Sequence, residues 1–125
     1  MTRTATLPGR VAVVAAFALF GLQWVWHGWL QPPTRAPSWL PALLFCLPIL
    51  PGLVLVLLRR RSAVFWLGVA SLFYFSHGLA EAWAVPAVRW LAWSQALLAC
   101  LVIIAGSWAG ARARFSRGRP TGGTV

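Results

Sequence analysis

The sequence predicts an all-α integral membrane protein, with four transmembrane helices in an up-and-down bundle. Of the 125 residues, 60% are hydrophobic and only 10% are charged, and the mean hydropathy is +0.76. A soluble domain of this size cannot hide so much apolar surface, because small domains leave a large share of their surface in water. At about 20 residues per span, the length accommodates four spans and no extramembrane domain.

Four apolar segments carry this prediction. The predicted helices cover residues 11–30, 39–58, 63–84 and 87–110. Residues 1–10 are expected to form a cytoplasmic N-terminus. Residues 111–125, which are rich in Arg, Gly, Ser and Thr, are expected to form a disordered basic tail. The first segment is longer than the apolar part of a signal peptide and no cleavage motif follows it, so we predict a retained helix.

Prolines and one serine mark the helix boundaries. Residues 31–38 contain three prolines and should form a loop. In the second span Pro41 suits a helix start. Pro48 and Pro51 must either kink or break that helix, and the sequence leaves both outcomes open. Ser62 is the expected N-cap of the third helix.

The arginines predict the orientation. All eleven basic residues are Arg, and four spans place nine of them on the side of both termini. These nine are Arg3, Arg10, Arg59, Arg60, Arg61, Arg112, Arg114, Arg117 and Arg119. The other side holds Arg35 and Arg89, so the positive-inside rule places both termini in the cytoplasm. We expect contacts with anionic headgroups rather than with nucleic acid, because the arginines flank apolar runs. The residues expected to make these contacts are Arg59, Arg60, Arg61, Arg112 and Arg114.

The tryptophans predict two interfacial belts, since indole rings favour the headgroup level. Two of the nine, Trp66 and Trp108, fall near the inner boundary. The outer belt is predicted to contain Trp24, Trp26, Trp29, Trp39, Trp83, Trp90 and Trp93.

Polar residues inside the spans are the candidate site, because polar groups are costly in the bilayer. Counted along the helical rise, they fall in the outer half of the membrane on three different helices. The candidates for an outward-facing polar pocket are Gln23, His27, Tyr74, His77, Glu81, Arg89 and Gln95. Gln23 and His27 are four residues apart and should share a helix face, as should His77 and Glu81. An ion pair between Glu81 and Arg89 is sterically reasonable across the Pro86 turn.

Two interpretations of this pocket stay open. The polar groups can pair with one another as packing contacts between helices. Alternatively, they can form a pocket for a small polar or amphipathic molecule, or carry a proton through a His–Glu couple. Metal binding is not expected from two histidines and one carboxylate. No cofactor is expected either, and we find no catalytic set, so we predict no enzymatic activity. Cys46 and Cys100 are expected to act as small hydrophobic residues.

A GxxxG pattern lies near the end of the fourth span. Gly106 and Gly110 allow close helix packing, and Ala92, Ala96 and Ala99 extend nearly the same face. Packing within one chain and dimerisation both fit this pattern.

One stretch of the sequence resembles a known family. Residues 47–53, the basic turn 59–61, Trp66 and the segment 74–82 (Tyr-Phe-Ser-His-Gly-Leu-Ala-Glu-Ala) resemble the small bacterial inner-membrane proteins of the domain of unknown function 2069 family. The Thr-Tyr associated with the start of the third helix is absent, and residues 62–65 (Ser-Ala-Val-Phe) stand there instead. The resemblance implies four membrane helices in a bacterial inner membrane, and it implies no activity.

These observations lead to three functional hypotheses. The first is a non-enzymatic accessory or assembly partner of a larger membrane system, possible also as a homodimer. The second is a small transporter or proton-linked carrier that uses His27, His77 and Glu81. The third is a quinone- or lipid-binding membrane subunit, in which tryptophans around His77 form an aromatic slot.

Overall fold

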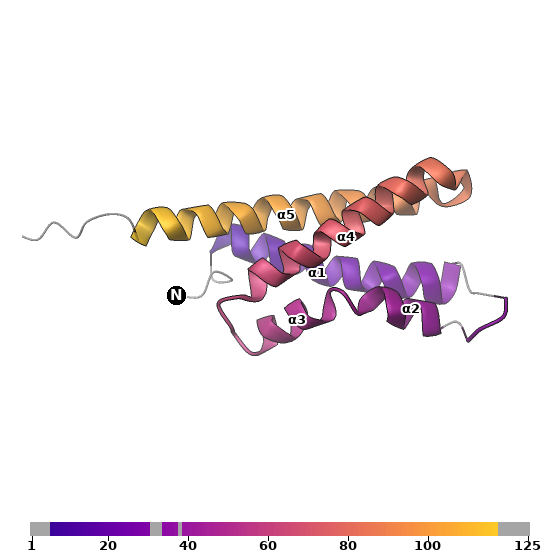
Figure 1. The fold of residues 1–125 in the computed structure, drawn as a ribbon, viewed down its shortest axis with the longest axis horizontal. Coiled ribbons are helices and arrows are strands. Elements are labelled where there is room, and N and C mark those ends of the chain that lie inside the picture. Colours follow the sequence, from indigo (N-terminus) through magenta and orange to yellow (C-terminus); the bar gives the residue numbers. More distant parts are fainter. Residues whose placement is uncertain (1–5, 31–33, 38, 118–125) are drawn as a thin grey trace, which may run out of the picture.

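The computed structural model describes residues 6–30, 34–37 and 39–117, and it is helical with no strand in these ranges (Figure 1). The elements follow one another along the chain. They are α1 (Leu7–Val25), a π-helical turn η2 (Trp26–Leu30), α2 (Trp39–Cys46), α3 (Leu50–Leu57), α4 (Ala63–Ala84), a 3-10 turn η3 (Pro86–Val88) and α5 (Arg89–Arg117).

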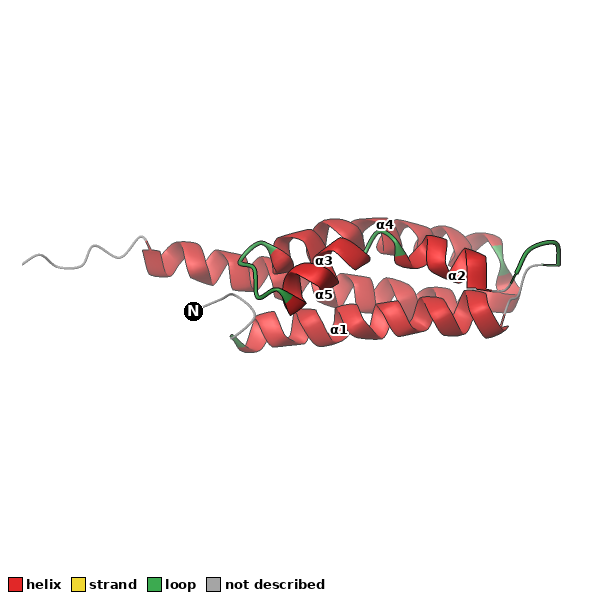
Figure 2. Ribbon diagram, turned by 90° about the horizontal axis from the view of Figure 1, so that it is seen from below, coloured by secondary structure: helices red, strands yellow, loops and turns green. Residues whose placement is uncertain are grey.

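Three helical segments are long and apolar enough to cross a membrane: Leu7–Leu30, Ala63–Ala84 and Pro86–Ser116. The pair α2 and α3 is a fourth candidate span, bent by 66° at its break. Figures 1 and 2 show this pair returning the chain towards the end at which α1 begins, where α5 also ends. The fold confirms the predicted all-α membrane class, with three spans, or four if the bent pair counts as one.

The second span is broken rather than kinked at its prolines. Residues 47–49 form a turn between α2 and α3. Pro48 and Pro51 have no N–H to donate to the preceding turn, so the regular hydrogen-bond ladder cannot continue through them. A tighter bond replaces it, in which the Leu50 N–H donates to the Leu47 carbonyl at 3.3 Å.

The first and the last helix of the chain, α1 and α5, extend beyond the predicted bounds. α1 begins at Leu7 because the Thr6 hydroxyl accepts the N–H of Gly9 at 3.2 Å and caps the helix. α5 continues to Arg117, so residues 111–117 are helical and the prediction of disorder there is wrong. Ala and Arg are strong helix formers, which explains the continuation through Ala-Arg-Ala-Arg. The rest of the predicted tail, residues 118–125, lies outside the described residues, as do residues 31–33 and 38 of the predicted loop.

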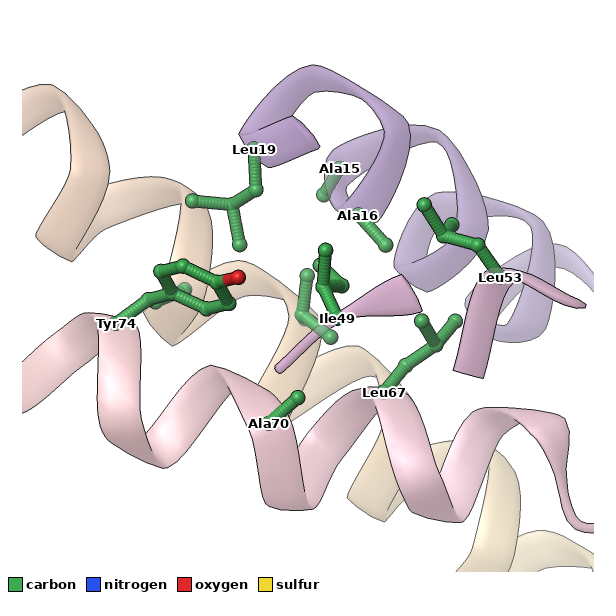
Figure 3. Packing of buried hydrophobic residues seen from close by; sticks show 10 residues of the cluster. Ala15, Ala16, Leu19, Ile49, Leu53, Leu67, Ala70 and Tyr74 are labelled. Atoms are coloured by element: carbon green, nitrogen blue, oxygen red, sulfur yellow. The ribbon is translucent and has the colours of Figure 1, made fainter. Parts of the chain in front are cut away.

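The main core lies where α1, the α2–α3 break, α4 and α5 meet (Figure 3). Alanines from α1 and branched side chains from the break and α4 fill it, and the ring of Tyr74 extends into it from α4. The buried cluster comprises Ala15, Ala16, Leu19, Ile49, Leu53, Leu67, Ala70, Tyr74, Ala99 and Val102. Dispersion contacts between such closely fitted side chains hold helices together where no hydrophobic driving force exists in lipid.

Small residues bring α4 and α5 close together. A Cβ atom placed on Gly78 would lie 2.8 Å from the Ala92 carbonyl oxygen and 3.0 Å from the Ala96 nitrogen. Further along, a Cβ on Gly106 would lie 3.2 Å from Cγ1 of Val64. Gly106 of the GxxxG pattern therefore packs within the chain.

The α3–α4 turn contains the described part's one non-glycine residue with a positive φ, Arg59, at 54°. The Arg60 N–H donates to the Leu55 carbonyl at 2.9 Å, which closes the end of α3 around this left-handed residue. α4 then begins at Ala63, directly after Ser62 as predicted, although the Ser62 side chain makes no capping hydrogen bond.

Eight tryptophans are exposed on the outside of the helices, as interfacial belts require. They are Trp24, Trp29, Trp39, Trp66, Trp83, Trp90, Trp93 and Trp108. Trp26 is different, because its side chain is completely buried. Its predicted place in the outer belt is wrong, since the π-helical turn that begins at this residue turns it inward among the helices.

Candidate polar site between the helices

The centre of the candidate site is the fully buried side-chain amide of Gln95 on α5. Its Oε1 accepts a hydrogen bond from Nε2 of Gln23 on α1 at 2.9 Å. Its Nε2 lies 2.8 Å from the Tyr74 carbonyl oxygen and 3.0 Å from Nδ1 of His77, both on α4. One amide therefore connects three helices.

These contacts determine the tautomer of His77. The Tyr74 carbonyl can only accept, so the Gln95 atom facing it must be the NH₂ group. That NH₂ group donates its second hydrogen to Nδ1 of His77, which must then be unprotonated. The proton of a neutral His77 ring is consequently on Nε2.

Aromatic rings enclose the two histidines. The His27 ring stacks on Phe45 with centroids 4.1 Å apart and on Trp26 at 5.1 Å. The His77 ring lies 4.8 Å from Phe45 and 6.3 Å from His27. Phe45 therefore bridges the two histidines from α2. The π-helical turn at Trp26 widens the end of α1, and such turns are frequent at functional sites.

Tyr74 links this site to the broken span. Its hydroxyl donates a hydrogen bond to the Phe45 carbonyl near the end of α2. A carbonyl at membrane depth needs a partner when the helical ladder is interrupted, and Tyr74 supplies one from α4.

Three buried polar atoms in the described structure have no hydrogen-bond partner: Oε1 of Gln23, Nε2 of His27 and Oγ of Ser71. An unpaired polar atom in an apolar environment is costly. Ser71, Phe45 and Trp26 were not among the candidate residues. Only Ser71 carried a sequence signal, as a polar residue on the α4 face that also carries Tyr74.

The expected ion pair between Glu81 and Arg89 is not formed in the described structure. Arg89 is exposed, and its Nε donates to the Ala82 carbonyl at 2.8 Å. That carbonyl would ordinarily accept the N–H four residues later, which is Pro86 and has none. Glu81 is half-buried one helical turn beyond His77. The structure thus brings together Gln23, His27, Tyr74, His77 and Gln95, with Glu81 at the edge and Arg89 outside.

The described residues contain no group of three His, Cys, Asp or Glu side chains that could hold a metal ion. The side-chain Oε1 of Gln23 and Nε2 of His27 are buried and keep unused hydrogen-bonding capacity. Grooves in the described structure lie elsewhere, on the outer surface of the helices.

The helices and the buried polar network define an all-α integral membrane protein. Within that class, the chain belongs to the family of predicted membrane proteins designated DUF2069, whose model matches residues 11–115. The resemblance noted from the sequence is thereby confirmed. Neither the curated proteins nor the solved structures contain a match to this chain.

Proposed function

We propose that the protein is a non-enzymatic accessory subunit, which binds the transmembrane helix of another membrane protein along its broken second span. The observation that carries this proposal is an apolar groove of about 760 Å³ beside α3 and α4. Its lining residues are Leu47, Pro48, Leu50, Pro51, Gly52, Val54, Leu55, Trp66, Val69 and Ala70.

The break creates this groove. α3 bends 66° away from α2, and this leaves Leu50 and Val54 exposed along the opening. None of the described residues that line the groove is ionisable, so the occupant must be apolar at this depth of the membrane. An apolar helix meets that requirement and can also fill the space with interlocking side chains.

The polar site supports the same assignment. Gln95 hydrogen-bonds across α1, α4 and α5, and therefore stabilises those three helices against one another. The second span takes part in this network only through rings and the Tyr74 contact. It is the span most available to a partner.

We further propose that the membrane is a bacterial inner membrane and that both termini are cytoplasmic. The beginning of α1, the α3–α4 turn and the end of α5 lie at one end of the molecule (Figure 2). Exposed arginines are concentrated there: Arg10, Arg59, Arg60, Arg61, Arg112 and Arg114. This distribution is typical of cytoplasmic ends.

Site-specific photo-crosslinking in the native membrane tests the function. A photoreactive residue replaces Val54 in the groove, and a matched one replaces Leu97, which is exposed on α5 and does not line this groove. We expect Val54 to yield one discrete polypeptide adduct that Leu97 does not. Native mass spectrometry should then show the chain together with that polypeptide. Adducts with lipid alone at both positions, and a solitary chain by mass, would overturn the proposal.

A second candidate is a small transporter or proton-linked carrier. The unpaired Gln23 Oε1 and His27 Nε2 favour it, because unpaired buried atoms beside His77 leave hydrogen-bonding capacity for a polar molecule. The test is proton flux into proteoliposomes under a pH gradient, with Glu81→Gln compared with Arg89→Gln outside the cluster. Flux that is lost only in Glu81→Gln would support a carrier. Flux equal to that of protein-free vesicles would exclude it.

A further inference from the structure

A second groove, of about 390 Å³, runs between the first half of α4 and the last half of α5. Phe65 and Leu72 of α4 and Ile103 of α5 form its apolar walls, and Arg114 lies at one end. It is independent of both the polar site and the groove beside α3, apart from Val69, which lines both grooves.

Glycines make this groove hollow. Gly68, Gly106 and Gly110 line it, and none of them has a side chain to fill the space between the helices. Gly106 is held close to Val64. At Gly68, by contrast, a Cβ atom would meet nothing within 4 Å. A larger side chain at Gly68 would therefore enter open space rather than clash.

The α5 wall of the groove has about the length of one leaflet of a bilayer. Its α5 wall runs from Ile103 to Arg114, which at the helical rise corresponds to about 16 Å. Half of the hydrocarbon core measures about 15 Å. An acyl chain lying against Gly106 and Gly110 would therefore extend from the middle of the membrane to the level of Arg114.

A positively charged side chain lies at one end of the groove. Among the described residues that line the groove, Arg114 is the one that is ionisable. The end of α5, which carries Arg114, lies at the same end of the molecule as the arginine-containing α3–α4 turn (Figure 1). The Ser107 hydroxyl also lines the groove, on the same face of α5. A guanidinium pairs with phosphate oxygens through two parallel hydrogen bonds. An apolar slot of one-leaflet length that ends in a guanidinium is complementary to an anionic phospholipid.

We propose that this groove is a specific binding site for one anionic phospholipid, with its acyl chain between α4 and α5 and its phosphate on Arg114. The lipid belongs to the leaflet that contains the arginine-rich end of the protein. This site is distinct from general attraction of the basic residues to the membrane surface, because it requires both the hollow and one particular arginine.

The test is native mass spectrometry of the full chain in detergent, titrated with phosphatidylglycerol or with phosphatidylcholine of the same acyl chains. The variant Arg114→Gln is compared with Arg112→Gln, which removes the same charge from an exposed residue that does not line the groove. A second pair compares Gly68→Leu, which fills the groove, with Gly21→Leu, where a Cβ also meets nothing within 4 Å.

We expect the unchanged chain to bind one phosphatidylglycerol in preference to phosphatidylcholine. Arg114→Gln should weaken that binding about fivefold, with a much smaller effect for Arg112→Gln. Gly68→Leu should weaken the binding of the acyl chain, and Gly21→Leu should not. Equal losses in the two arginine variants would overturn the proposal, as would unchanged binding in Gly68→Leu. A dimer that Gly68→Leu disrupts while lipid binding persists would assign the groove to a second copy of the chain and would also overturn it.

Discussion

Gln23 and Gln95 lie 72 positions apart in the chain, and their buried side-chain amides share a hydrogen bond of 2.9 Å. The bond joins α1 to α5. Gln95 then continues to α4 through the Tyr74 carbonyl and the His77 ring. The two amides therefore differ in the number of hydrogen bonds that they make. Gln95 has three partners, whereas the Oε1 atom of Gln23 has none.

This difference predicts unequal effects of their replacement. Gln95→Leu should destabilise the folded protein by about 1–2 kcal/mol, because it leaves the Gln23 amide and the His77 Nδ1 atom unpaired. Gln23→Leu should cost less, because it also removes one atom that is already unpaired. Unfolding in mixed detergent micelles, followed by circular dichroism, measures both. A Gln23→Leu variant as unstable as Gln95→Leu would contradict the central role of Gln95.

The contact of α4 with α5 at Gly78 predicts a steric effect. Gly78→Ala should destabilise the protein by about 1–3 kcal/mol, because the added methyl group would meet the backbone of α5 at Ala92 and Ala96. Gly21→Ala is the matched control on a helix surface with open space, and it should be neutral or slightly stabilising. Thermal unfolding in detergent compares the two. Equal melting temperatures would show that the helices can separate at this point without loss.

The contact between Tyr74 and the Phe45 carbonyl predicts a local effect at the broken span. Tyr74→Phe removes the hydroxyl, so local opening of the break should become easier. Cys46 lies beside the break and is buried, and its reaction with a membrane-permeant maleimide should accelerate about fivefold. Cys100 on α5 is the internal control and should react at an unchanged rate. Parallel acceleration at both cysteines would indicate global rather than local loosening.

The left-handed conformation of Arg59 predicts a stabilising substitution. Arg59→Gly should raise the free energy of unfolding by about 1 kcal/mol, because glycine adopts this conformation without a Cβ penalty. Arg60→Gly removes the same charge at a residue whose φ is not positive, and it should give no such gain. Denaturation in detergent distinguishes the two. A matched gain in both variants would point to relief of charge repulsion instead.

Helix boundaries could be predicted where the sequence provides an unambiguous stop. α4 covers residues 63–84 as predicted, because arginines and Ser62 precede it and Pro86 follows it. The predicted start of α1 at residue 11 is four residues later than the observed start at Leu7. Pro8 and Gly9 are poor helix formers, and the helix includes them because Thr6 caps it. A proline in the first turn needs no N–H partner, and this explains why the helix tolerates it.

The site could be predicted only at the level of depth and composition. Helical rise placed polar residues of α1, α4 and α5 at similar depth, and Gln23, His77 and Gln95 do meet there. Their pairing could not be predicted, because it depends on how each helix is rotated. The π-helical turn at Trp26 changes that rotation within α1. The contact of Arg89 could not be predicted either, because its acceptor is the Ala82 carbonyl, which Pro86 leaves without an N–H donor.

The broken second span also has a consequence for how the chain enters the membrane during synthesis. α2 and α3 have eight residues each, so each is about 12 Å long and neither crosses the hydrocarbon core alone. The hydroxyl that satisfies the Phe45 carbonyl belongs to Tyr74, which leaves the ribosome 29 residues later. We therefore expect stable insertion of this segment to wait for α4, so that the two enter the bilayer together as one hairpin.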